Sequence, residues 1–279
     1  MKKAQEIKRI VRRGYAQIAK RATKGCCGPT KGPCGGPGRE VEVGRKIGYR
    51  QTELSAVPEG ANLGLGCGNP TALASLKEGE TVLDLGSGAG FDCFLSANRV
   101  GRTGKVIGVD MTPEMIARAR RNARKGDFPN VEFRLGEIEN LPVADDSVDV
   151  IISNCVINLV PDKRRAFQEA FRVLKSGGRM FVSDLVLTRR LPWSILKESS
   201  ALVGCIAGSW MKDRYISAIR SAGFRHVRIL SQTYFPTDFI TDCSIGKKIT
   251  ARQAKGISRS VLSIHVTGLK PVRKGGETS

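Results

Sequence analysis

The chain has 279 residues and a formal net charge of +20 at pH 7, a length that suits one large domain or a domain with an appendage. Its 41% hydrophobic and 26% charged residues are ordinary for a globular protein and exclude a wholly disordered chain. The positive charge suggests nucleic acid as a partner. However, 18 of the 20 excess charges lie in residues 1–50 and 246–279, so the central region is nearly neutral and we expect no specific nucleic-acid partner.

The cysteine content indicates a reducing environment. There are 8 cysteines, but a chain long enough to bury a full core does not need disulfides to fold. Charged residues interrupt every apolar run near the N-terminus, which argues against a secretory signal, and no apolar run is long enough to span a membrane. We therefore expect a cytoplasmic monomer with reduced thiols.

Residues 1–60 are expected to form an N-terminal extension. Residues 1–22 predict a basic amphipathic helix, because Ile7, Val11 and Tyr15 recur near helical spacing. Such a helix could lie on an anionic surface or pack on the main domain, and we favour packing. Residues 23–38 are rich in Gly, Pro and Lys and predict a loop that carries three cysteines.

Strands and helices alternate through the rest of the chain, which predicts a parallel sheet with helices on both faces. Thr112-Pro113-Glu114 is typical of a helix start, and residues 161–178 predict a helix that ends before Gly177. We divide this part into a core, 61–185, and a C-terminal part, 186–279. The predicted strands are 81–85, 105–110, 131–135, 148–154, 179–185, 226–232 and 261–269.

A glycine-rich turn follows the first predicted core strand, in Asp84-Leu85-Gly86-Ser87-Gly88-Ala89-Gly90. Glycines permit a tight turn and the close approach of a ligand to the backbone. Asp110 ends the next strand, where a carboxylate can bind a ribose diol. The spacing G-x-G-x-G differs from the dinucleotide pattern, and the acid before the first glycine suits a cationic ligand better than a pyrophosphate.

This pattern resembles the cofactor motif of class I S-adenosylmethionine methyltransferases. The resemblance implies an α/β fold with a Rossmann-like seven-stranded sheet whose last strand is antiparallel, helices on both faces, and here an added N-terminal helix and cysteine loop. It places the glycines near the methionine part of the cofactor, Asp110 on the ribose and Asn154 on the sulfonium side. The implied cofactor-binding residues are Asp84, Gly86, Ser87, Gly88, Gly90, Asp110, Met111, Glu137, Ile138 and Asn154.

Cys155 directly follows the predicted strand 148–154, at the edge of the sheet where ligands bind. Methylation of oxygen or nitrogen commonly needs a base, but His226 and His265 both fall inside late predicted strands. A soft nucleophile with a lone pair needs no base. Trivalent arsenic held by thiolates is such a nucleophile.

Four further segments are similar to the arsenite S-adenosylmethionine methyltransferase family: residues 53–59 (ELSAVPE), 62–70 (NLGLGCGNP), 204–208 (GCIAG) and 26–28 (CCG). The resemblance implies methylation of arsenite or its thiol conjugates, with Cys67, Cys155 and Cys205 as arsenic ligands. It also implies a disulfide between Cys67 and an N-terminal cysteine, for which Cys27 is slightly favoured over Cys26 and Cys34. A thioredoxin- or glutathione-type reductant would restore the thiols, and no structural metal is expected.

Three alternatives remain open on the sequence: a quinone-type C- or O-methyltransferase, an RNA-binding modification factor and a non-catalytic metalloid scavenger. Cys93 and Cys243 are expected to be small buried residues. Residues 118–126 (RARRNARKG) predict a solvated helix face. The basic residues around Cys26 and Cys27 are expected to lower the thiol pKa values there.

Overall fold

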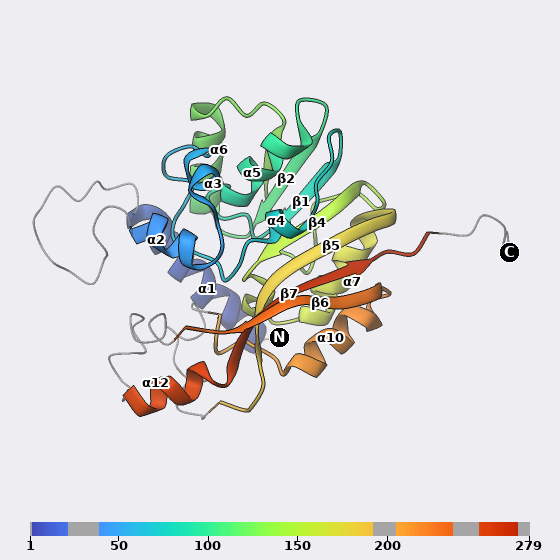
Figure 1. The fold of residues 1–279 in the computed structure, drawn as a ribbon. Coiled ribbons are helices and arrows are strands. Elements are labelled where there is room, and N and C mark those ends of the chain that lie inside the picture. The colour runs from blue at the N-terminus through green and yellow to red at the C-terminus, as the bar shows by residue number, and fades with distance from the viewer. Residues whose placement is uncertain (1, 22–38, 192–204, 237–250, 273–279) are drawn as a thin grey trace, which may run out of the picture.

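The computed structural model describes residues 2–21, 39–191, 205–236 and 251–272 (Figure 1). Their strands form one seven-stranded sheet in the order β3-β2-β1-β4-β5-β7-β6. All neighbouring strands are parallel except β7, which is antiparallel to both β5 and β6. The predicted class I methyltransferase sheet is therefore confirmed. The strands are β1 Thr81–Leu85, β2 Lys105–Asp110, β3 Val131–Leu135, β4 Val148–Asn154, β5 Leu174–Leu187, β6 Arg225–Tyr234 and β7 Val261–Leu269.

Helices cover both faces of this sheet (Figure 1). Because side chains alternate along a strand, β1 contributes to two cores. Val82 packs with Phe94 of α5 in one core, and Leu83 packs with Phe167 of α7 in the other. The helices are α1 Lys2–Arg21, α2 Arg39–Lys46, α3 Gln51–Ser55, α4 Pro70–Leu73, α5 Phe91–Val100, α6 Pro113–Lys125, the 3-10 helix η1 Ile157–Leu159, α7 Lys163–Val173, α10 Lys212–Ser221 and α12 Ala251–Ser258.

The N-terminal helix packs on the main domain, as favoured from the sequence. Val11 and Ala19 are buried, and the guanidinium of Arg118 on α6 donates a hydrogen bond to the Ala19 carbonyl at 3.1 Å. Lys8 and Lys20 form ion pairs with Glu137 and Glu114 respectively. None of the described helices combines the length and apolar character needed to cross a membrane.

One local prediction is wrong, and a second holds only in part. Helix α7 ends at Val173 rather than before Gly177, because Leu174 already pairs with Val148 in the sheet. The segment 118–126 is not wholly solvated, because Arg118 is only 6% exposed. Its side chain donates to the Gly60 and Ala19 carbonyls and so ties α6 to two other parts of the chain. The division at residues 60 and 185 stays a prediction.

Candidate active site

A cavity opens at the carboxyl ends of β1, β2 and β4, where open α/β sheets bind their ligands. Its walls come from the loops after these strands, from residues 61–66 and from α1. Eight of the ten predicted cofactor-binding residues line it: Asp84, Gly86, Ser87, Gly88, Asp110, Met111, Ile138 and Asn154. Segments far apart in the sequence therefore converge on one cavity.

Two glycines of the loop stand where a larger residue would either clash with a neighbour or extend into the cavity. Gly86 has a φ of +71°, and a Cβ there would strike Val156. Gly88 has a φ of +52°, but a Cβ there would meet no atom within 4 Å, so its backbone faces open space in the cavity. The nearby Ser87 hydroxyl is buried without a hydrogen-bond partner in the described structure. This combination fits a polar ligand lying against the loop.

Asp110 is buried at the end of β2 and fixes the loop geometry. Its carboxylate accepts hydrogen bonds from the backbone N–H of Gly88 at 3.0 Å and of Thr112 at 2.8 Å. Burial raises the pKa of Asp110, and these two N–H groups act in the opposite direction. The remaining acceptor capacity of the carboxylate suits the two hydroxyls of a ribose.

Two predicted residues do not line the cavity. Gly90 begins α5 with a φ of +95°, and a Cβ there would strike Phe133, so its position is explained by packing. Glu137 instead faces α1, where it forms ion pairs with Lys8 at 2.7 Å and Arg12 at 3.4 Å. Glu139 lines the cavity two residues further on. The motif Leu-Gly-Glu-Ile-Glu contains two acids, and the sequence alone did not show which of them faces inward.

A pair of buried carboxylates lies on the cavity wall, and only one of them was predicted. Asp84 and Asp92 are 2% and 7% exposed, and neither forms an ion pair with a basic group among the described residues. Burial raises the pKa of both carboxyl groups, that of Asp92 to about 6, and the charge of Asp92 raises the pKa of Asp84 further. Unneutralised carboxylates in a cavity favour a cationic ligand.

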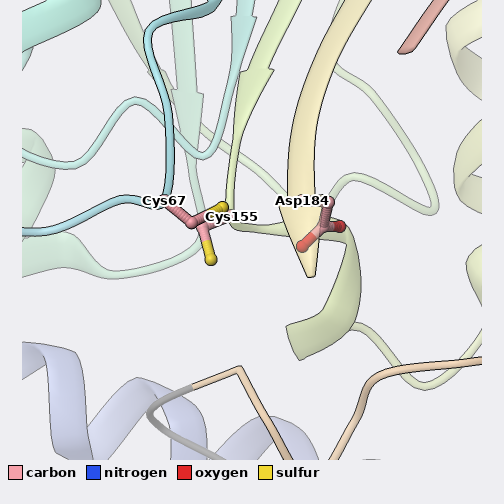
Figure 2. A group of neighbouring side chains, drawn as sticks. All are labelled: Cys67, Cys155 and Asp184. Atoms are coloured by element: carbon pink, nitrogen blue, oxygen red, sulfur yellow. The ribbon is translucent and has the colours of Figure 1, made fainter. Parts of the chain in front are cut away.

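The three predicted arsenic-binding cysteines converge at the edge of this cavity. Cys67, Cys155 and Cys205 are all buried and unoxidised. Cys155 and Cys205 line the cavity, and the Cys205 thiol donates to the Cys155 carbonyl at 2.8 Å. Cys67 lies beside Cys155, as Figure 2 shows. Both Cys155 and Cys205 have positive φ values, +59° and +64°, an uncommon conformation that often marks functional sites.

The surroundings of these three sulfurs shift their pKa values upward, which favours the neutral thiol over the thiolate. Burial raises the pKa of Cys67. The contact of Cys155 with Cys205 lowers the pKa of Cys155, but the contact with Cys67 and burial outweigh it, so the net shift is well upward. The contact with Cys155, followed by burial, raises the pKa of Cys205 well above its usual range. Cys93 is fully buried away from the cavity wall, as expected, and donates to Asp84 at 3.2 Å.

Asn154 connects the thiols to the glycine-loop side of the cavity. Its amide oxygen accepts from the Cys67 N–H at 3.0 Å. Its amide nitrogen donates to Asp92 at 3.2 Å and to the Tyr49 hydroxyl at 2.9 Å, and that hydroxyl donates to Asp92 at 2.6 Å. Tyr49 and Asp92 were not predicted, because nothing in their local spacing indicates that they meet Asn154. Cys26, Cys27, Cys34 and Cys243 lie outside the described residues.

Comparison with known proteins agrees with this geometry. A sequence profile described as a methyltransferase domain matches residues 76–223. The chain is 47% identical to an arsenite methyltransferase of Halobacterium salinarum over 88% of its length and 65% of the relative. It is 33% identical to the human arsenite methyltransferase, over 81% of this chain and 60% of the relative. The crystal structure of an arsenic(III) S-adenosylmethionine methyltransferase from Chlamydomonas reinhardtii matches with a TM-score of 0.63 at 32% identity, covering 87% of this chain and 76% of that one.

The sheet order, the glycine loop and the profile match define a class I methyltransferase domain. The similarity to relatives and the three converging cysteines are more specific, and the chain belongs to the arsenite methyltransferase family. It spans 65% and 60% of the length of the two curated relatives described above.

Proposed function

We propose that the protein transfers a methyl group from S-adenosylmethionine to trivalent arsenic, giving methylarsenite and, on a second turnover, dimethylarsenite. One observation carries the proposal: three buried thiols from distant parts of the chain meet at the cavity lined by the glycine loop and Asp110. Soft sulfur ligands favour a thiophilic centre such as arsenic(III). A general base is not needed, because the arsenic lone pair is the nucleophile.

The chain's residues fit the proposed methyl donor. When bound, S-adenosylmethionine supplies an electrophilic methyl group on a positively charged sulfur. Asp110 would bind the ribose, the open surface at Gly88 would receive the methionine part, and Asp84 and Asp92 would neutralise the positive charge. Met111, Ile138 and Glu139 would border the adenine. These roles rest on the cavity walls and on the lack of a basic partner for the two acids among the described residues.

The neutral thiols suit the capture of arsenite. In the exchange As(OH)₃ + 3 RSH → As(SR)₃ + 3 H₂O, each thiol proton leaves with one arsenic hydroxyl as water. Binding therefore requires no net release of protons. It does not depend on free thiolates of Cys67, Cys155 and Cys205, which burial disfavours. The cavity and α1 would restrict water at the reacting centre.

Methylation leaves arsenic in the pentavalent state, so each turnover needs two electrons. We propose that an N-terminal cysteine attacks the arsenic-bound sulfur of Cys67. A disulfide forms, the As–S bonding pair returns to arsenic, and the attacking thiol loses its proton. A thioredoxin-type dithiol, or two glutathione-type monothiols, would then reduce the disulfide. This cycle requires a reducing compartment, and we propose the cytoplasm.

The decisive assay is incubation with S-adenosylmethionine, arsenite and a thiol reductant, followed by separation of the arsenic species. We expect methylarsenite, with one S-adenosylhomocysteine formed per methyl group. Parallel reactions with a quinol or a catechol test the C- and O-methyltransferase alternatives. Methylation of those acceptors with no methylated arsenic would contradict the proposal.

The affinity for S-adenosylmethionine should depend on the charge of Asp92. Its pKa is raised to about 6 in the free protein, and a bound cation lowers that pKa, so binding should tighten as pH rises through about 6 and weaken below it. The pKa of Asp84 is raised as well. Asp92→Asn should weaken binding at pH 8 about tenfold and flatten the dependence. Calorimetric titrations from pH 5.5 to 8 test this, and an unchanged pH profile in the variant would refute it.

Removing the Tyr15 side chain should weaken the binding of both arsenite and S-adenosylmethionine. Tyr15 and Val11 of α1 line the cavity, and Tyr15 is hydrogen-bonded to Cys205. We expect Tyr15→Ala to reduce the affinities for arsenite and S-adenosylmethionine roughly tenfold each, because the cavity loses part of its cover. Gln17→Ala, on the exposed side of α1, is the matched control. Equal affinities in the wild type and Tyr15→Ala would show that α1 does not close the site.

A further inference from the structure

Behind the three thiols lies a buried carboxylate for which the mechanism above has no use. Asp184 is 0% exposed near the end of β5, and it does not line the cavity. Its carboxylate oxygen and the sulfurs of Cys67 and Cys155 all lie within 4.8 Å of one another. Figure 2 shows the three side chains grouped where β5 meets the loop after β4.

Three donors hold Asp184 in place as an acceptor. One carboxylate oxygen accepts from the Asn158 amide at 2.8 Å and from the Leu185 N–H at 2.9 Å. The other accepts from the Tyr215 hydroxyl at 3.0 Å. Hydrogen bonds of this kind favour the ionised form and fix its orientation, while burial acts against ionisation and raises the pKa to about 7.

No basic side chain among the described residues forms an ion pair with Asp184. The nearby Lys163 ammonium donates instead to the Asn158 and Val160 carbonyls, at 3.3 and 3.0 Å. The Lys163 charge lowers the pKa of Asp184, but the two groups form no ion pair, and a buried carboxylate without a directly paired cation is costly to maintain. It is therefore suited to stabilise a positive charge that appears nearby only during a reaction.

The proposed reaction creates such a charge beside these thiols. The arsenic lone pair forms the As–C bond, and the pair of the broken C–S bond stays on the cofactor sulfur. Sulfur becomes neutral, and the positive charge moves to the arsenic, which is bonded to one methyl group and three cysteine sulfurs. We infer that Asp184 stabilises this developing charge on arsenic and thereby accelerates methyl transfer; the inference rests on the proposed function.

Asp184→Asn tests the inference, because an asparagine keeps the shape and can still accept from Asn158. We expect arsenite and S-adenosylmethionine affinities within about threefold of the wild type, and a single-turnover methylation rate about ten- to a hundredfold lower. Asp149→Asn removes a carboxylate at the opposite end of the sheet, where Asp149 accepts from the Thr81 N–H, and should leave the rate unchanged. Tyr215→Phe removes one donor that lowers the pKa of Asp184, so the rate should rise with pH at a higher pH than in the wild type, and at pH 9, where the carboxylate is ionised, it should fall less than threefold.

A second readout uses the free protein without cofactor or arsenic. The negative charge of Asp184 disfavours thiolates at Cys67, Cys155 and Cys205. In Asp184→Asn, the iodoacetamide reactivity of Cys155 should therefore rise at a pH about one unit lower than in the wild type. A purely structural role would not produce a shift in this direction. Asp184→Ser provides the same test if the asparagine variant does not fold.

The outcomes separate the inference from the proposed function. A wild-type protein that forms no methylated arsenic contradicts the proposed function, and the inference falls with it. If the wild type turns over but Asp184→Asn matches its single-turnover rate within threefold, the inference alone is overturned. It is also overturned if weaker arsenite binding accounts for the whole loss, or if Tyr215→Phe at pH 9 is as slow as Asp184→Asn.

Discussion

Replacing Cys155 or Cys205 with serine should reduce arsenite methylation by roughly a thousandfold or more, while S-adenosylmethionine binding stays within about threefold of the wild-type value. Serine fits the space, but its hydroxyl is a hard, weak ligand for arsenic(III). The two thiols line the same cavity wall, and loss of either leaves at most two sulfurs to hold the substrate. Arsenic speciation after a fixed incubation measures the effect.

Cys93→Ser is the control for this experiment. Cys93 is equally buried but lies off the cavity wall, and a serine there can still donate to Asp84. We expect its methylation rate to stay within about threefold of the wild type. Turnover near the wild-type level in both Cys155→Ser and Cys205→Ser would contradict the proposed arsenic site.

Asp110→Ala should produce the complementary loss. It removes the carboxylate proposed to bind the ribose and the acceptor that holds the Gly88 N–H, so we expect S-adenosylmethionine to bind at least about a hundredfold more weakly. Arsenite binding should stay close to the wild-type value, because Asp110 donates no ligand to the thiol site. Titration calorimetry with each ligand measures both effects.

An exposed acid provides the control for Asp110→Ala. Asp213 lies in the first turn of α10, outside the cavity, and Asp213→Ala should bind both ligands normally. We therefore expect opposite results from the two kinds of variant. The cysteine variants should lose arsenite methylation and still bind the cofactor, whereas Asp110→Ala should lose cofactor affinity and still bind arsenite. If Asp110→Ala lost both ligands equally, misfolding or a different cofactor site would be the better explanation.

Local sequence patterns predicted the sheet well. Apolar runs bounded by turns gave the limits of β1, β2, β3, β4 and β7 as the structure has them. The end of α7 was not predictable in this way, because Leu174 continues the helical stripe and is drawn into the sheet by pairing with Val148. Here a long-range contact overrides a local signal.

The candidate site was predictable only where a motif marked it. Cys155 could be placed from its position after β4, whereas Cys67 and Cys205 entered through family resemblance. Asp92 and Asp184 gave no local signal, because their significance depends on neighbours such as Tyr49 and Tyr215 that are distant in sequence. Buried acids of this kind can be recognised as candidates only in the folded structure, which shows that none of the described basic side chains forms an ion pair with them.

The proposed function requires three thiols that hold arsenic beside the methyl donor, and X-ray absorption at the arsenic edge tests this directly. The sample is the full chain with one equivalent of arsenite and a phosphine reductant, so that no added thiol competes for arsenic. We predict three sulfur neighbours and no oxygen neighbour in the wild type, and fewer sulfur neighbours in Cys155→Ser. An oxygen-bound arsenic in the wild type, or the same number of sulfur neighbours in both proteins, would contradict the proposed three-thiol site.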